Sequence, residues 1–226
     1  MMSDNGAETQ LTPLQVGDLA PKFTLPAADH EGSVSLADYS GRPLLLGFFR
    51  GIYCPFCRRA IVRMGQAWEQ LRGEGVRALA IVATSPENAR RYFRFRPPKV
   101  AVAADRNLTT HRLYGVPAPW RSDIEEAFRT TRINPSGELP SPLPIREASA
   151  ALSRLEGFEP TPTDREDAAQ PYLQFSGQFL VDPNGIIRWT SIECAGEGPG
   201  PSRTLAGLGK FPTDEELLEA VRALLT

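Results

Sequence analysis

The strongest constraint on the fold is residues 43–83, which predict a strand, a helix and a second strand joined by tight turns. Residues 43–50 form a continuous apolar run, a pattern typical of a strand buried on both faces of a sheet. Over residues 57–71 apolar side chains recur at alternating steps of four and three, which places them on one helical face and leaves Arg58 off it. Residues 76–83 form a second apolar run. Because a helix joins the two strands, we expect them to be parallel neighbours in one sheet.

The rest of the chain continues to alternate strand and helix patterns. In chain order the other predicted elements are a hairpin over 23–25 and 33–36, a helix from Ser85 that stops before Pro97, a strand over 100–103, a helix over 108–114, a hairpin over 178–181 and 186–189, and a last helix that Thr213 and Glu216 cap. The order is βαβ, an intervening segment, then ββα. It predicts an α/β protein with a thioredoxin-like fold, in which helices flank a central mixed sheet.

The intervening segment, residues 117–175, breaks this rhythm because it holds nine prolines. Two helices are predicted inside it, one over 122–131 that begins with a Ser122–Glu125 capping box and one over 146–156. Its apolar periodicity is too sparse for a separate core. We therefore expect a flexible start over residues 1–15 and one domain over 16–226 that carries 117–175 as an insertion.

Composition excludes several classes of function. The 226-residue chain has a formal net charge of −2, which does not favour a nucleic-acid partner. The basic segment 90–96 is interpreted as an amphipathic helix that buries Ala89, Tyr92 and Phe93 and leaves a solvated basic face. The first dozen residues are mostly polar and no apolar run is long enough to cross a bilayer, so we expect no membrane association and a cytoplasmic location. Three cysteines do not describe a disulfide-rich secreted scaffold.

The chemistry of the chain is expected at Cys54-Pro55-Phe56-Cys57, where the first strand turns into the helix. Pro55 suits the first helical position, which makes Cys54 the N-cap. First-turn N–H groups and the helix dipole favour a thiolate there, and Arg50, Arg58 and Arg59 are close enough in sequence to add positive charge. Cys54 is thus predicted to be an exposed nucleophile of lowered pKa. Cys57 is predicted to be the more shielded thiol that resolves a disulfide with it.

Three other interpretations of the cysteines stay open. Cys54 and Cys57 could be incidental core residues. They could bind zinc, but two further ligands would have to come from Cys194, His111 and His30, so no metal and no organic cofactor are expected. Cys194 is expected to be a semi-buried free thiol, with an auxiliary resolving role as the alternative.

Three motifs carry a resemblance to a known family. Residues 46–57 resemble the F-x-R-G-x-W-C-P-x-C segment of bacterial peroxiredoxin-like proteins, which belong to the alkyl hydroperoxide reductase/thiol-specific antioxidant branch of the thioredoxin superfamily. Residues 17–23 are similar to that family's G-x-x-A-P-x-F entry, and residues 179–189 to its F-x-I-D-x-x-G-x-I-R-W hairpin. The resemblance covers roughly residues 16–115 and 177–192. It implies a thiol-dependent enzyme that takes a peroxide or disulfide substrate and is recycled by a thioredoxin- or glutaredoxin-type system; a homodimer is one option for its assembly.

The chain departs from the family at positions that bear on peroxide binding. Gly47 and Gly51 stand where P-x-x-x-T-x-x-C has its proline and threonine, and residues 174–177 lack the family's arginine. Ser176 stands where thioredoxins have a cis-proline. Arg50, or an insertion arginine such as Arg121 or Arg132, is a candidate replacement. The remaining candidate site residues are Gly51, Tyr53, Pro55, Phe56 and Ser176.

The sequence therefore predicts a cysteine-based antioxidant oxidoreductase that reduces disulfides readily and hydroperoxides more slowly. The alternative is a peroxiredoxin in which Cys54 is peroxidatic and Cys57 resolving. A hypothesis of another class is an interaction protein switched by the same disulfide. If the threonine hydroxyl is limiting, Gly51→Thr should raise the peroxide rate.

Overall fold

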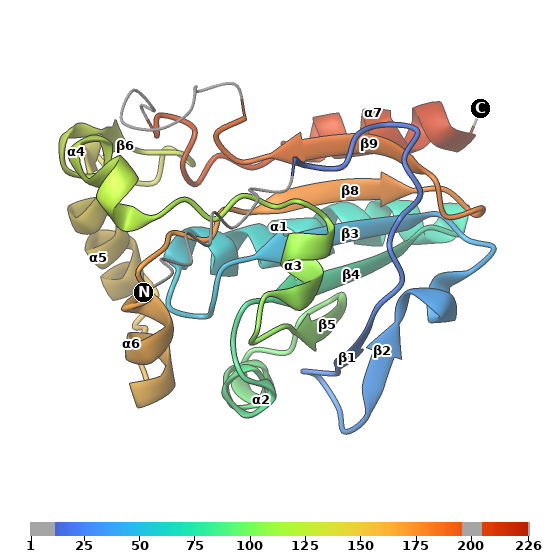
Figure 1. Cartoon of the computed structure of the whole chain (residues 1–226), viewed down its shortest axis with the longest axis horizontal. Coiled ribbons are helices and arrows are strands. Elements are labelled where there is room, and N and C mark those ends of the chain that lie inside the picture. Colours follow the sequence, from blue (N-terminus) through green and yellow to red (C-terminus); the bar gives the residue numbers. More distant parts are fainter. Residues whose placement is uncertain (1–11, 196–204, 226) are drawn as a thin grey trace, which may run out of the picture.

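The computed structural model describes residues 12–195 and 205–225 and is built on one five-stranded mixed sheet (Figure 1). The strands lie in the order β5-β4-β3-β8-β9, which are Ala101–Ala104, Arg77–Val82, Leu44–Phe49, Gly177–Val181 and Ile187–Ile192. Strands β3, β4 and β5 are parallel, whereas β8 and β9 run antiparallel to their neighbours. The predicted parallel pairing of β3 with β4 is confirmed, with Leu44 opposite Arg77 and Phe49 opposite Val82.

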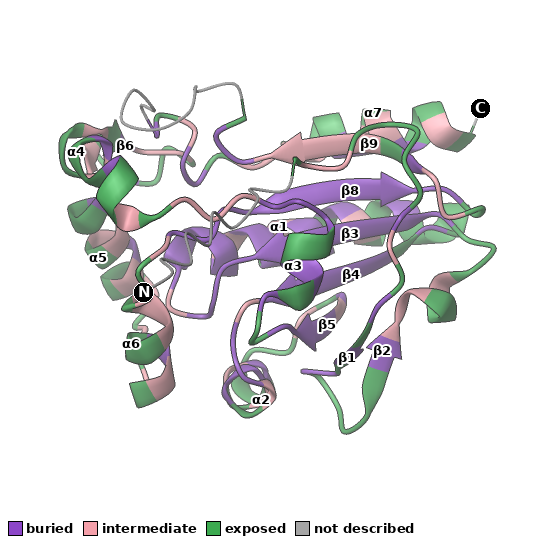
Figure 2. Ribbon diagram, viewed as in Figure 1, coloured by how far each residue is buried: buried purple, intermediate pink, exposed green. Residues whose placement is uncertain are grey.

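Both faces of the sheet are covered, as the apolar run of β3 predicts. On one face Leu45 and Phe49 pack into the cluster formed with helix α1, Pro55–Leu71. On the other face Leu46 and Phe48 pack with Tyr114. Figure 2 shows the central strands buried and the outer faces of the helices exposed. We call the five-stranded sheet and the elements outside residues 117–175 the frame. Its other elements are β1 Thr24–Pro26, β2 Ser33–Ser35, α2 Pro86–Phe95, α3 Thr109–Leu113, α7 Asp214–Leu225 and the 3₁₀ turns Leu36–Tyr39 and Arg72–Glu74.

Local capping explains where the frame helices begin and end. Ser85 Oγ accepts a hydrogen bond from the Asn88 amide, and Thr213 Oγ1 accepts one from the Glu216 amide, so both predicted N-caps are confirmed. Helix α1 gives way to a 3₁₀ turn that closes at Gly75, whose φ of +83° is a left-handed conformation that glycine adopts at little cost.

Residues 117–175 place three helices at the end of the sheet where α1 begins (Figure 1). Its elements are the 3₁₀ turn Arg121–Ile124, α4 Glu125–Thr130, the two-stranded β6 Arg132–Ile133 and β7 Leu143–Pro144, α5 Ile145–Leu155 and α6 Pro162–Ala168. Their buried side chains, Ile145 and Leu152 among them, belong to the same apolar cluster as Cys57. The segment is therefore packed directly on the frame; its description as an insertion in a single domain stays a prediction.

Several expectations for this segment are wrong. The helix expected over 122–131 is split, and no Ser122–Glu125 capping box forms, because Ser122 Oγ donates to the neighbouring Asp123 carboxylate. Helix α6 and strands β6 and β7 were not predicted. The missed signal for α6 is a capping box in which Thr161 and Asp164 bond to each other's amides.

Arg58 is also misplaced by the helical pattern, since it is 3% exposed instead of lying on the solvated face. In the segment 90–96, Ala89 and Phe93 are buried as expected, and Tyr92 is half-buried. Most of the predicted flexible start lies outside the described residues. Among the helices described, none is long and apolar enough to span a membrane, and a cytoplasmic location stays a prediction.

Candidate active site

Cys54 lies between strand β3 and helix α1, directly before the first residue of the helix. Its backbone is extended, with φ −85° and ψ 111°, and its Sγ accepts a hydrogen bond from the Cys57 amide at 3.4 Å. Pro55 occupies the first helical position. The predicted N-cap geometry is therefore confirmed, and one orphan amide of the first turn points at the sulfur.

Cys54 is more buried than the sequence predicts, whereas the burial of Cys57 agrees with the prediction of a shielded thiol. Cys54 is 4% exposed and Cys57 is 1% exposed, so the expectation of an exposed nucleophile is wrong. Residues of the 117–175 segment, Arg121 and Leu173 among them, line the pocket next to Cys54. Access is through a pocket of about 540 Å³ that Cys54 lines together with Tyr53 and Phe56.

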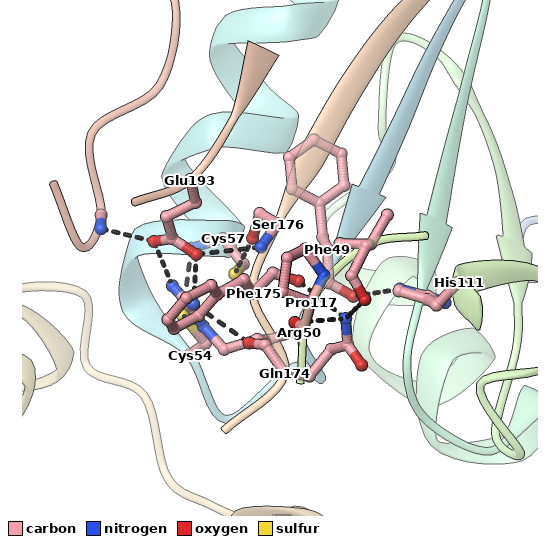
Figure 3. Close-up of polar contacts among 12 residues, drawn as sticks. Phe49, Arg50, Cys54, Cys57, His111, Pro117, Gln174, Phe175, Ser176 and Glu193 are labelled. Carbon is pink, nitrogen blue, oxygen red and sulfur yellow. Dashed lines mark hydrogen bonds and ion pairs between the residues drawn. The ribbon is translucent and has the colours of Figure 1, made fainter. Parts of the chain in front are cut away.

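A buried arginine contacts the Cys54 sulfur (Figure 3). Arg50 Nε donates to Cys54 Sγ at 3.3 Å. The other end of the guanidinium forms a two-pronged ion pair with Glu193, with Nη1 2.5 Å from Oε2 and Nη2 2.9 Å from Oε1. Nη1 also donates to the Gln174 carbonyl at 3.1 Å. Because Glu193 holds both terminal nitrogens of the guanidinium, its Nε edge is fixed toward the sulfur.

Glu193 was missed by sequence reasoning. It follows strand β9 and lies 143 residues from Arg50 in the chain. Its carboxylate also accepts hydrogen bonds from the Ser176 amide at 2.9 Å and the Gly209 amide at 2.5 Å. The Glu193 carboxylate thus links Arg50 to the residue before strand β8 and to the loop before α7. Nothing local in the sequence marks Glu193, because its partners come from separate segments.

The two thiols have opposite pKa shifts. Burial by itself raises the pKa of Cys54, but the hydrogen bond from the Cys57 thiol, the charge and hydrogen bond of Arg50 and the Cys57 amide outweigh it and lower the pKa to about 6. Burial raises the pKa of Cys57 well above its ordinary value, and the hydrogen bond to Cys54 and the charge on Cys54 raise it further. At neutral pH this favours a thiolate at Cys54 and a thiol at Cys57.

Two further predicted residues border the thiols. Ser176 Oγ lies 3.6 Å from Cys57 Sγ. Burial raises the pKa of the Tyr53 phenol, which keeps it neutral at the pocket wall.

The two glycines that depart from the family pattern lie in crowded surroundings, Gly47 more so than Gly51. A Cβ at Gly47 would come within 2.6 Å of the Phe49 ring. A Cβ at Gly51 would lie 3.0 Å from both the Ala83 carbonyl oxygen and the Tyr53 ring. A larger residue at Gly47 would require the Phe49 ring to shift, and one at Gly51 would make a tight contact with the Ala83 backbone.

The other arginines proposed from the sequence do not share one position in the site. Arg58 and Arg59 do not contact the sulfur; both pair with Glu156 on the segment after α5, and Arg59 also pairs with Glu138. Arg121 lines the pocket, whereas Arg132 donates to the Pro142 carbonyl and is not part of the lining.

The residues weighed as zinc ligands do not converge on the cysteine pair. His111 is buried between Asp105 and the Phe49 carbonyl oxygen, and His30 hydrogen-bonds Asp29 on the surface. No group of three or more His, Cys, Asp or Glu side chains suited to a metal is found in residues 12–195 and 205–225. Cys194 is buried, with a left-handed φ of +55°.

Comparison with known proteins identifies the family of the chain. The model of the AhpC/TSA family matches residues 16–137. The chain belongs to the AhpC/TSA family. Among curated proteins, peroxiredoxin Bcp of Escherichia coli K12 is 34% identical over 82 residues, which is 36% of this chain and 52% of that protein. Thiol-disulfide oxidoreductase ResA of Halalkalibacterium halodurans is 26% identical over 125 residues, 54% of this chain and 70% of that protein.

The match to the Bcp relatives is partial, since the chain spans about half of their length. Among solved structures, AhpC of Mycobacterium bovis aligns with a TM-score of 0.57 at 14% identity and covers 96% of this chain and 95% of its own. At that identity the likeness establishes the thioredoxin-like peroxiredoxin fold alone.

Proposed function

We propose that this protein is a thiol-dependent reductase of small hydroperoxides, with Cys54 as nucleophile and Cys57 as resolving thiol. The observation that carries the proposal is the Arg50 Nε donor 3.3 Å from Cys54 Sγ. A reductase of this kind needs a thiolate and a preorganised donor at the place where charge develops on the departing oxygen. Arg50 supplies the donor that the missing threonine and the missing late arginine would otherwise provide.

The reaction begins with attack of the Cys54 thiolate on the terminal oxygen of the hydroperoxide. The O–O bond breaks, Cys54 becomes a sulfenic acid, and the departing alkoxide takes a proton and leaves as an alcohol. Cys57 then attacks the Cys54 sulfur, which forms the disulfide and releases water. A dithiol reductant of the thioredoxin or glutaredoxin type supplies two electrons and returns both cysteines to thiols.

Burial of Cys54 supports one of the two substrate classes that the sequence left open. Cys54 is 4% exposed and faces a pocket of about 540 Å³, a size that suits a small organic molecule. A disulfide in a folded protein would have to present its sulfur through that opening. The geometry therefore favours hydroperoxides first and disulfides second, which reverses the order expected from the sequence.

Disulfide exchange remains the second candidate because of the contact between the two thiols. Cys57 is hydrogen-bonded to Cys54 through both its amide and its thiol, so an internal disulfide forms with little movement. A relative named thiol-disulfide oxidoreductase supports keeping this activity in the test.

The test compares catalytic efficiency on cumene hydroperoxide and on a small aromatic disulfide, with dithiothreitol as reductant. We expect a higher kcat/KM for the hydroperoxide and loss of both activities in Cys54→Ser. Faster disulfide reduction would replace the proposal by the second candidate. Oxidation of one equivalent with no further turnover would instead support the redox-switched interaction protein.

A further inference from the structure

The pocket next to Cys54 carries more positive charge than reduction of a hydroperoxide requires. Three arginines line it, Arg50, Arg121 and Arg146, and among the described residues no aspartate or glutamate does. Arg50 already pairs with Glu193 and donates to the Cys54 sulfur, so its charge is compensated within the protein. The excess positive charge therefore belongs to the other two arginines, both of which come from the 117–175 segment.

Arg121 and Arg146 gather around one aromatic ring. Their guanidinium carbons lie 5.8 Å and 5.6 Å from the centroid of the Phe128 ring. The three residues come from the 3₁₀ turn, α5 and α4 respectively, so three elements converge at one side of the pocket. Arg121 is further fixed by its bonds to the carbonyl oxygens of Gln170 at 2.8 Å and Ala168 at 3.1 Å.

Arg121 and Arg146 differ from the neighbouring arginines in their ion pairing. In the described part of the chain no carboxylate pairs with Arg121 or Arg146, whereas Arg58 and Arg59 close by are matched with glutamates. Guanidinium groups bind carboxylates through paired, charge-assisted hydrogen bonds. The remainder of the lining is mostly apolar, with Ile145, Leu173 and Leu208 among it. A ligand that fits both parts has an apolar body and an anionic end.

We propose that the pocket selects organic hydroperoxides that carry a carboxylate, with Arg121 and Arg146 as the residues that determine this specificity. The O–O group reaches Cys54, the apolar body lies against Leu173 and Leu208, and the carboxylate pairs with the arginines. The carboxylate is unchanged by the reaction. This inference rests on the proposed hydroperoxide reduction and names its substrate class.

The test uses three hydroperoxides that share one apolar body and one O–O bond: cumene hydroperoxide, its para-carboxylate derivative and the methyl ester of that derivative. Reduced protein is mixed with each in single turnover, which keeps the recycling reductant out of the measurement. We expect the acid to react about tenfold faster than its ester at equal low concentration, the effect of one charge-assisted contact. The ratio should fall toward one as salt screens the charges.

Variants assign the preference to the arginines. Arg146→Gln should reduce the acid-to-ester ratio several-fold, and the double variant with Arg121→Gln should bring it to one. Arg154→Gln, an exposed arginine on α5 outside the pocket, is the matched control and should keep the wild-type ratio.

The outcomes separate the two proposals. Equal rates for acid and ester in wild type overturn the specificity while leaving hydroperoxide reduction intact. An unchanged ratio in folded Arg146→Gln and in the double variant overturns the assignment to these residues. No reaction of Cys54 with any of the three compounds, or with hydrogen peroxide, overturns the proposed function itself.

Discussion

The frame around Cys54 and the segment 117–175 hold their arginines in different ways. Arg50, in the frame, is buried, fully paired with Glu193 and in contact with the sulfur. Arg121 and Arg146, in the segment, are half-buried and exposed and have no acidic partner among the described residues. A buried charge must be compensated within the protein, whereas a charge at a pocket mouth is solvated until a ligand arrives. The difference suggests that the frame sets reactivity and the segment sets selectivity.

The largest effect should come from replacing each of the two thiols of the frame, Cys54 and Cys57, in turn. Cys54→Ser should lower hydroperoxide turnover by about 1,000-fold or more, since the attacking atom is lost. Cys57→Ser should keep the first oxidation but lose recycling, so that the Cys54 sulfenic acid accumulates and can be trapped with dimedone and detected by mass spectrometry. A Cys57→Ser variant that turns over normally would show that another thiol resolves, and Cys194→Ser would then be the next variant to measure.

The second effect concerns the arginine of the frame. In wild type the rate of iodoacetamide alkylation at Cys54 should follow the thiolate, falling as the pH drops through about 6. Arg50→Gln removes the stabilising charge, so the pKa should rise toward that of an ordinary thiol, about 8.5, and alkylation at pH 7 should fall roughly 30-fold. The hydroperoxide rate should fall by about 100-fold in total, more than the alkylation rate, because Arg50 is also lost as a donor to the departing oxygen.

Arg50→Gln also leaves Glu193 buried without its partner, so a matched variant is needed. The double variant Arg50→Gln with Glu193→Gln removes both charges and should show the same raised pKa with less loss of stability. Arg91→Gln, an exposed position on α2, is the control. If the double variant alkylates like wild type, the arginine does not determine the thiolate.

A third experiment removes a contact between helix α1 of the frame and the 117–175 segment. Arg58 donates to Glu156 at 2.6 Å, to the Ile52 carbonyl at 2.7 Å and to Ser153 at 3.3 Å. Its guanidinium also lies 3.8 Å from the Phe158 ring centroid. Arg58→Gln should lower the free energy of unfolding by about 3 kcal/mol, measured by urea denaturation, because buried partners are left unpaired. Arg154→Gln should change it by no more than about 0.5 kcal/mol.

The smallest effect tests the crowding at Gly51. From the sequence, Gly51→Thr is expected to raise the hydroperoxide rate if the missing hydroxyl is the limiting group. The structure gives the opposite expectation, since a Cβ there already lies 3.0 Å from the Ala83 carbonyl oxygen. We expect a loss of about 1–2 kcal/mol in stability and a lower hydroperoxide rate in stopped-flow assays. Gly51→Ala should show a milder form of both losses, and a faster Gly51→Thr enzyme would contradict this account.

The sequence by itself determined the frame and the position of the nucleophile. Strand β3, helix α1 and strand β4 follow from apolar runs and helical spacing, which are local properties of the chain. The N-cap position of Cys54 follows from the same local pattern, because Pro55 fixes where the helix starts.

Only the tertiary structure decided what surrounds that nucleophile. Glu193 pairs with Arg50 across 143 residues of sequence, and no periodicity links two side chains at that separation. Arg58 falls outside the apolar stripe and is still buried, because the segment carrying Glu156 covers that side of α1. The pocket arises in the same way, from turns and short helices whose side chains meet only once the chain has folded. Local patterns report how a segment is built, whereas charge compensation and pocket shape depend on which distant segments pack against it.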